Sequence, residues 1–181
     1  MKGKGEQGFT LIELLIVVAI ISIIAAIAVP GLLRARMTGN ESSAIASLRT
    51  TTSSQVSYSA ACGNGGYAAT YAILGQAPAS GGQGFISADL GSVAQPVKSG
   101  YDFDMDMGGG AAVTGVTDCT TAANTPVTNF WARAEPSGLG TTGTRGFGVT
   151  ANMTIWQDTT GVAPTVTAMN AAPTANPAPI Q

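Results

Sequence analysis

The distribution of apolar residues divides the chain at about residue 33. From Phe9 to Leu33 the sequence holds 25 residues with one charge, Glu13. Apolar side chains would fall on every face of a helix built from this run, so no polar stripe is left to face water. As an α-helix the run would be about 37 Å long, more than the ~30 Å hydrocarbon core of a bilayer. We therefore predict a helix surrounded by lipid or by other helices.

An amphipathic pattern follows the apolar run. Apolar residues recur at helical spacings between charged ones, at Leu33, Met37, Ala44, Ile45, Leu48 and Val56. We predict that the same helix continues to about Ala60, with a kink at Pro30. Two separate helices broken at Pro30-Gly31 are the alternative. The Gly-rich run that starts at Cys62 has strong turn chemistry and should end the helix.

Strand signals appear after a loop-rich connector over residues 67–98. The segment Tyr101–Met107 alternates apolar and acidic residues with the period of two that a half-buried strand shows. Val127–Glu135 is a second candidate, and Arg145–Thr150 with Met153–Asp158 reads as a hairpin. We predict an α+β fold in which an antiparallel sheet of three or four strands covers the distal half of the helix. The sheet residues expected to face the helix are Tyr101, Phe103, Phe147 and Trp156.

Composition removes several classes of function. Charged residues make up 10% of the chain, the net charge is −2, and there is no His. His-based triads, most zinc enzymes and a basic nucleic-acid-binding face are therefore not indicated. The two cysteines, Cys62 and Cys119, would form one disulfide in an exported protein, and two separate buried thiols are the alternative. The disulfide would close a loop of roughly 58 residues, worth about 4 kcal/mol of denatured-state entropy.

Asp102, Asp104 and Asp106 suggest the start of a calcium loop, but the sixth and twelfth positions are Met107 and Val113 instead of Gly and Glu. We interpret the three acids as the exposed side of a strand. The other acids show no spacing that would pair them as general acid and base, and no base is present to activate a serine. We expect neither an enzyme, nor a cofactor, nor a metal site.

The N-terminal run has three interpretations. A cleaved secretory signal would use the basic start at Lys2 and Lys4 and a cleavage site at Ala26-Ile27-Ala28, although the run is long for such a signal. A simple membrane anchor explains the length and leaves the cost of Glu13 unexplained.

The third interpretation rests on the motif Gly8-Phe9-Thr10-Leu11-Ile12-Glu13. It resembles the processing site of type IV prepilins and of the related pseudopilins of type II secretion. The resemblance implies that prepilin peptidase cuts after Gly8, that the new terminus Phe9 is N-methylated, and that Glu13 is the fifth residue of the mature chain. Pro30 also falls where many family members carry a helix-bending proline.

This interpretation gives the acid a physical purpose. Cutting after Gly8 would create an ammonium on Phe9, which Glu13 of a neighbouring subunit could neutralise in an apolar filament core. A wrong stagger would leave both charges unpaired, at a cost of several kcal/mol. The pair of Phe9 and Glu13 would therefore set the register of assembly.

The resemblance divides the chain into a leader, an assembly half of the helix, an amphipathic half, a β head and a Pro/Ala-rich tail, at residues 1–8, 9–33, 34–60, 61–160 and 161–181. The tail has four Pro and no charge, so we expect it to be exposed and extended.

The resemblance also implies a function. We expect a structural subunit of a type IV pilus that polymerises with itself into a helical filament, with adhesion or motility as family roles. Its partners would be prepilin peptidase, the pilus assembly machinery and membrane lipid, and nucleic acid is not directly evident. The subunit would span the bacterial inner membrane once and then enter an extracellular filament. A type II secretion pseudopilin is the first alternative, and an exported soluble binding domain cut after Ala28 is the second.

Overall fold

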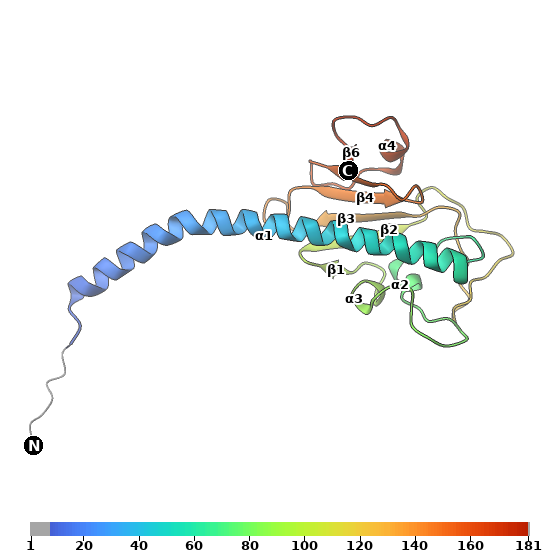
Figure 1. Cartoon of the computed structure of the whole chain (residues 1–181), viewed down its shortest axis with the longest axis horizontal. Helices are drawn as coiled ribbons and strands as arrows, with labels where there is room; N and C mark the ends of the chain where they lie inside the picture. The colour runs from blue at the N-terminus through green and yellow to red at the C-terminus, as the bar shows by residue number, and fades with distance from the viewer. Residues whose placement is uncertain (1–7, 181) are drawn as a thin grey trace, which may run out of the picture. The chain divides into compact units, whose positions relative to one another are not determined.

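The structure is a computed structural model in which residues 8–180 are described. Of the expected leader, only Gly8 lies among the described residues. The chain forms two compact units, residues 1–36 and residues 37–181, and each is considered by itself (Figure 1).

One helix, α1 (Leu11–Ala61), runs through both units for 51 residues. It continues without interruption through Pro30 and Gly39, so the alternative of two helices broken at Pro30-Gly31 is wrong. A proline removes one intrahelical hydrogen bond and crowds the preceding turn. Here an apolar run precedes it and the helix-forming residues Leu32 to Met37 follow it, and the helix continues across the proline. The kink at Pro30 stays a prediction.

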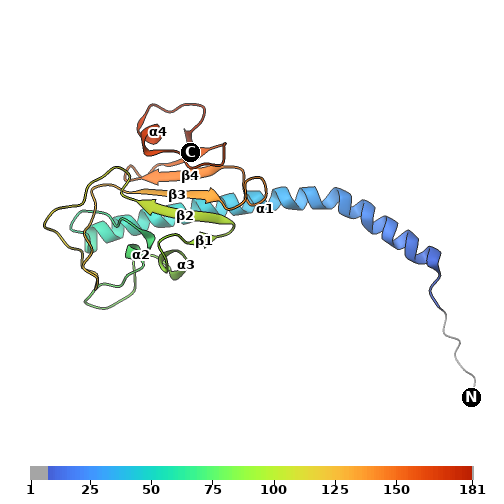
Figure 2. The same cartoon turned by 180° about the vertical axis from the view of Figure 1, so that it is seen from behind.

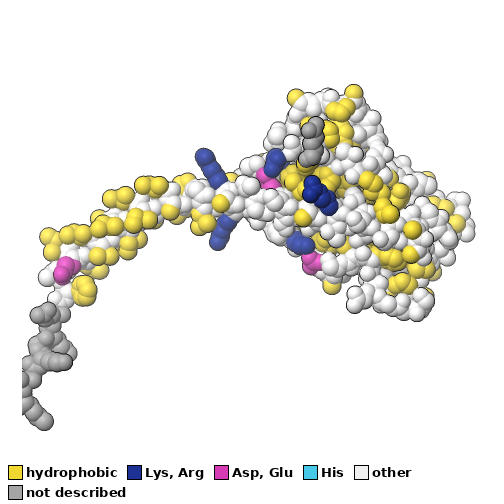
Figure 3. Space-filling model, in the orientation of Figure 1, with side chains coloured by type: hydrophobic (Ala, Val, Ile, Leu, Met, Phe, Trp, Pro, Cys, Tyr) yellow, Lys and Arg dark blue, Asp and Glu magenta, His cyan; other side chains and the backbone are white. Residues whose placement is uncertain are grey.

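In the N-terminal unit, every described side chain is exposed. Leu11 is 75% exposed and Ile27 is 76% exposed, and apolar side chains cover the face of this stretch of α1 that Figure 3 shows. By length and composition, the helix is suited to cross a membrane. An apolar surface of this extent requires a covering environment, which the single chain does not supply.

The second unit is built on a six-stranded antiparallel sheet in which each strand pairs with the next one along the chain. Its strands are β1 (Val97–Lys98), β2 (Tyr101–Asp106), β3 (Trp131–Pro136), β4 (Gly146–Thr150), β5 (Ile155–Asp158) and β6 (Ala178–Pro179). The predicted α+β class is confirmed, and the four central strands match the four segments that the sequence indicated. The two edge strands were not predicted, because two residues cannot show an alternation.

Three short helices complete this unit. They are α2 (Tyr71–Leu74), α3 (Ala88–Gly91) and α4 (Val166–Asn170). The side chains of Thr70 and Thr165 cap α2 and α4, each accepting a hydrogen bond from a backbone N–H three residues on.

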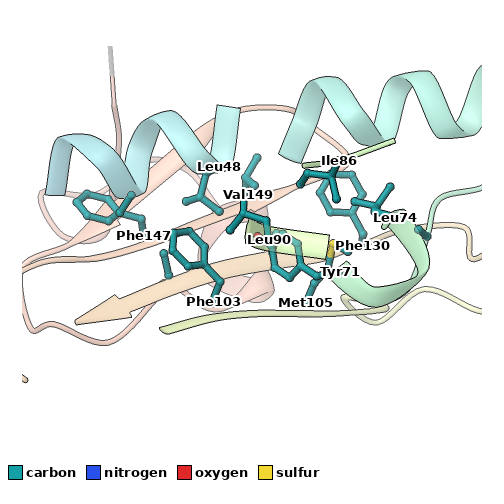
Figure 4. Packing of buried hydrophobic residues seen from close by; sticks show 14 of the residues in the cluster. Leu48, Tyr71, Leu74, Ile86, Leu90, Phe103, Met105, Phe130, Phe147 and Val149 are labelled. Atoms are coloured by element: carbon teal, nitrogen blue, oxygen red, sulfur yellow. The ribbon is translucent and has the colours of Figure 1, made fainter. Parts of the chain in front are cut away.

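The core lies between one face of the sheet and the second half of α1. Figure 4 shows Leu48 of α1 directed toward Phe103, Phe147 and Val149 of the sheet. The buried side of α1 repeats every three or four residues, at Glu41, Ala44, Ser47, Leu48, Thr51, Ser54, Gln55 and Tyr58. Five of these eight residues were not predicted because they are polar, and Val56, expected in the stripe, is 52% exposed.

The expected orientation of Trp156 is wrong, whereas Tyr101, Phe103 and Phe147 belong to the core as predicted. Ile155 pairs with Val149 and packs in the core cluster, so alternation directs the next residue, Trp156, to the opposite face of the sheet. Trp156 is nevertheless buried, and all five residues of β4 are buried. Something must therefore cover the second face of the sheet as well.

The covering element is the C-terminal segment, which is not the exposed, extended tail that its composition suggested. Ala163 and Met169 are buried, β6 pairs with β5, and α4 lies against β4 (Figure 2). A Cβ added at Gly146 would lie 2.3 Å from the backbone of Val162, so glycine lets the two backbones approach closely. Small apolar residues without charge suit this contact, in which there is little room for side chains.

We predict that Met169→Ala lowers the free energy of unfolding by about 2–3 kcal/mol, because it removes a buried side chain between α4 and β4. Urea unfolding of the detergent-solubilised chain, followed by fluorescence of the two sheet tryptophans, measures this change. Val162→Ala is the matched control, since Val162 is 60% exposed and should change stability by less than about 0.5 kcal/mol. Equal effects of the two substitutions would contradict the packing described for this segment.

Candidate functional site

The first site is the N-terminal end of α1, where Thr10 and Glu13 form a capping box. The backbone N and Oγ1 of Thr10 donate to Oε2 of Glu13 at 3.0 and 2.7 Å, and the backbone N of Glu13 donates to Oγ1 of Thr10 at 3.3 Å. These reciprocal bonds satisfy N–H groups that a helix start otherwise leaves unpaired. Sequence reasoning missed this role of Glu13, although Thr-x-x-Glu before an apolar run is its known signature.

Both hydrogen bonds that Glu13 accepts from Thr10 end on the same oxygen, Oε2. Within the described residues, 8–180, Oε1 of Glu13 has no hydrogen-bond donor. The side chains next to it in the sequence, Ile12 and Leu14, are 65% and 61% exposed and apolar. The end of the helix thus presents one carboxylate oxygen, near the positive end of the helix dipole, amid apolar surface.

Gly8 and Phe9 precede this capping box and lie outside the helix. Phe9 is 89% exposed, and none of the residues that the structure describes lies within 4 Å of a Cβ added at Gly8. Residues 8–180 therefore leave the peptide bond between Gly8 and Phe9 uncovered. In the uncut chain the nitrogen of Phe9 is an amide and carries no charge, so a cationic partner for Glu13 can arise from Phe9 only after cleavage.

The second feature is the disulfide between Cys62 and Cys119, with an S–S distance of 2.07 Å. The predicted pairing is present, and the alternative of two separate thiols is wrong. Cys62 directly follows α1, and Cys119 lies in the long connection between β2 and β3. The backbone N of Cys119 also donates to the carbonyl of Cys62 at 3.2 Å. The disulfide and this hydrogen bond together fasten the β2–β3 connection to the end of α1.

Asp118, next to the disulfide, is the centre of a buried polar network. Its carboxylate accepts hydrogen bonds from the Tyr58 hydroxyl at 2.6 Å, the Thr120 hydroxyl at 2.7 Å and the Asn124 backbone at 2.9 Å. Burial alone would raise the pKa of Asp118, but these bonds together hold the pKa below its ordinary value of 3.8. Burial, with Asp118 as a further cause, raises the pKa of the Tyr58 phenol. At physiological pH, a neutral phenol therefore donates a hydrogen bond to a charged carboxylate.

Glu41 fastens the loop between β3 and β4 to α1. Its carboxylate accepts two hydrogen bonds of 2.9 Å from Thr144, and Oε2 lies 2.6 Å from Nη2 of Arg145. One residue earlier, the Asn40 side chain donates to the carbonyl of Thr142 at 2.9 Å. No local pattern in the sequence predicts these contacts, because the partners are 102–104 positions apart along the chain.

The acidic side of β2 is not arranged as a calcium site. Asp104 and Asp106 both pair with Arg133 on the neighbouring strand, and Asp102 accepts a hydrogen bond from Ser137 at 2.7 Å. Over residues 8–180, no cluster of three or more His, Cys, Asp or Glu side chains could hold a metal ion.

Comparisons with known proteins agree with the N-terminal site. Residues 3–29 match the family described as the prokaryotic N-terminal methylation motif. A stretch of 38 residues is 58% identical to the type IV wide pilus major component PilA4 of Thermus thermophilus, and it covers 21% of this chain and 29% of that relative. No solved structure matches the chain. The similarity is to a structural filament component and not to an enzyme.

We predict that Asp118→Asn lowers the free energy of unfolding by about 2–3 kcal/mol at pH 7, because the variant loses charge-assisted hydrogen bonds in a buried place. The pKa of Asp118 is lower in the folded than in the unfolded chain. Its stabilising contribution is therefore complete above its ordinary pKa of 3.8 and is lost as the pH falls below that value.

The difference in stability between wild type and Asp118→Asn should accordingly shrink in urea titrations at about pH 3 compared with pH 7. Asp102→Asn, on the exposed side of β2, is the control and should change stability by less than about 0.5 kcal/mol. A difference for Asp118→Asn that is the same at both pH values would refute this account.

Proposed function

We propose that this chain, which is type IV pilin-like in its N-terminal segment, is a structural subunit of a type IV pilus. It is cut after Gly8 by prepilin peptidase, N-methylated at Phe9 and polymerised into a helical filament. The observation that carries the proposal is the end of α1, where an accessible Gly8-Phe9 bond, a capped acid and a fully exposed apolar helix follow one another.

The apolar half of α1 has a different cover before and after assembly. In the bacterial inner membrane lipid surrounds it, and in the extracellular filament the helices of other subunits replace lipid, with the assembly machinery moving the subunit between the two. Because lipid is as apolar as leucine, close packing has to drive this exchange more than the hydrophobic effect does. Small residues that allow close approach are spaced along the helix, at Ala19, Ser22, Ala25, Ala26 and Ala28.

The capping box and the assembly contact can coexist on one carboxylate. Thr10 occupies Oε2 of Glu13, so Oε1 is available to accept a hydrogen bond from the ammonium of Phe9 on a neighbouring subunit. The acid therefore does not have to give up its own helix cap when the filament forms. Breaking such a pair in an apolar core costs about 3–5 kcal/mol, and that penalty opposes every wrong stagger.

The mature N-terminus tests the maturation step directly. We expect mass spectrometry of the filament-borne or membrane-borne chain to find N-methylated Phe9 as the first residue, since cleavage after Gly8 removes the whole leader. Gly8→Asp should block cleavage and leave the full-length precursor in the membrane. A mature chain that begins at Val29 would instead indicate a conventional signal sequence and would refute the proposal.

Glu13→Gln separates the two tasks of the acid. Glutamine can complete a capping box but carries no charge, so the variant should be processed and inserted normally yet lose the register contact. With about 3–5 kcal/mol lost per subunit, we expect filaments to fall below detection in electron micrographs of sheared cell surfaces.

Thr10→Ala is the complementary variant, because it removes the cap and keeps the charge. It should weaken the helix start by about 1 kcal/mol and still yield filaments. Wild-type numbers of filaments from Glu13→Gln would show that the charge of Glu13 has no part in assembly.

A further inference from the structure

The second unit carries two adjacent exposed aliphatic side chains, Leu139 and Val162. They are 64% and 60% exposed. Leu139 belongs to the loop between β3 and β4, and a Cβ added at Gly161 would lie 2.3 Å from its Cδ1, so Leu139 covers the residue before Val162. We call Leu139 and Val162 the knob.

A groove of about 390 Å³ lies beside the end of α1, lined by Val56, Ser59, Ala60, Gly65 and Tyr67. Val56 is 52% exposed, although the hydrophobic pattern placed it in the core stripe. The ring of Tyr67 packs edge-on against Phe130, with ring centroids 5.2 Å apart, so this wall of the groove is fixed by the core. We call this surface the groove.

The knob and the groove lie at opposite ends of the second unit. The loop that carries Leu139 is hydrogen-bonded to Asn40, whereas the groove begins at Val56 of the same helix. Sixteen helical residues separate these two positions, which corresponds to about 24 Å. The knob therefore cannot reach the groove of its own chain.

The distribution of charge permits an apolar contact between the two surfaces. The sequence has no Asp, Glu, Lys or Arg from residue 50 to residue 88, and Figure 3 shows no charged side chain on this face of the distal end of the unit. In the loop that carries Leu139, the guanidinium of Arg145 is already held by Glu41 and Gln157 of its own chain.

We propose that the knob of one subunit docks into the groove of the next subunit. The inference rests on the proposed function, because it requires that copies of this chain polymerise. A patch that fits a different patch on an identical molecule makes a heterologous contact, and such contacts build open filaments when the rotation does not close. An aliphatic pair can enter the groove without removing any charge from water, which keeps the desolvation cost low.

Cysteine cross-linking tests the contact. The native cysteines are paired, and the described residues include no free thiol. In filaments of the double variant Leu139→Cys with Val56→Cys, mild oxidation should produce a ladder of dimers, trimers and higher multimers on non-reducing gels. A ladder requires two different positions to meet on successive subunits, and the distance within one chain excludes an internal bond.

Two controls separate this contact from random collisions. Leu139→Cys alone can yield dimers at most. Leu139→Cys with Val93→Cys replaces the groove valine by another valine, 50% exposed, that lines neither surface, and it should give no ladder.

Wild-type filaments together with a double variant that forms no ladder would overturn the knob-and-groove contact and leave the proposed function standing. If the wild-type chain forms no filaments at all, both proposals fail. As a second measurement, Leu139→Ser and Val56→Ser should each reduce filament yield by about tenfold, the equivalent of losing the burial of one aliphatic side chain. The two substitutions combined should do little more than either one, because they remove the same contact. Yields that multiply would contradict the inference.

Discussion

The exposed apolar half of α1 is the constraint on which the rest of the molecule depends. Leucine and isoleucine side chains between residues 11 and 32 are 53–76% exposed, and none of the described residues covers them. Exposing such an apolar surface to water costs a free energy of about 25 cal/mol for each Å². This part of α1 therefore requires an apolar environment, such as lipid or other helices. In such an environment, any charge on it needs a designated partner.

Glu13 satisfies this requirement in two stages. In the single chain, Thr10 compensates the acid through two hydrogen bonds to one oxygen and gains a helix cap in return. In the proposed function, the other oxygen accepts a hydrogen bond from a cation that arises only when the chain is cut. The local hydrogen-bonding motif lowers the cost of keeping an acid in an apolar environment and leaves that oxygen for a neighbour. The proposed cleavage and the observed capping box both involve the six residues 8–13.

Much of this could be predicted from the sequence, for reasons that differ between elements. The helix and the four central strands follow from periodicities of three to four residues and of two, which local sequence records directly. Trp156 was assigned to the wrong face because one residue of register reverses every side chain in a strand. The packing of the C-terminal segment was not predicted, because its composition shows few large apolar side chains. The segment packs instead through close backbone contact at Gly146. The anchors at Glu41 and Asp118 depend on partners at 103–104 and 60 positions away, and no local pattern reports them.

The use of charge in the second unit connects its stability with assembly. The ion pairs of Glu41 with Arg145 and of Asp104 and Asp106 with Arg133 join elements within one chain. The disulfide and the Asp118 network fasten the end of α1 without placing any charge on the surface around the groove. These charges therefore act within the unit, and uncharged surfaces are left for the contacts between subunits that we propose. Such a division would favour a polymer, because every contact is repeated along a filament and a small desolvation cost per subunit would be repeated with it.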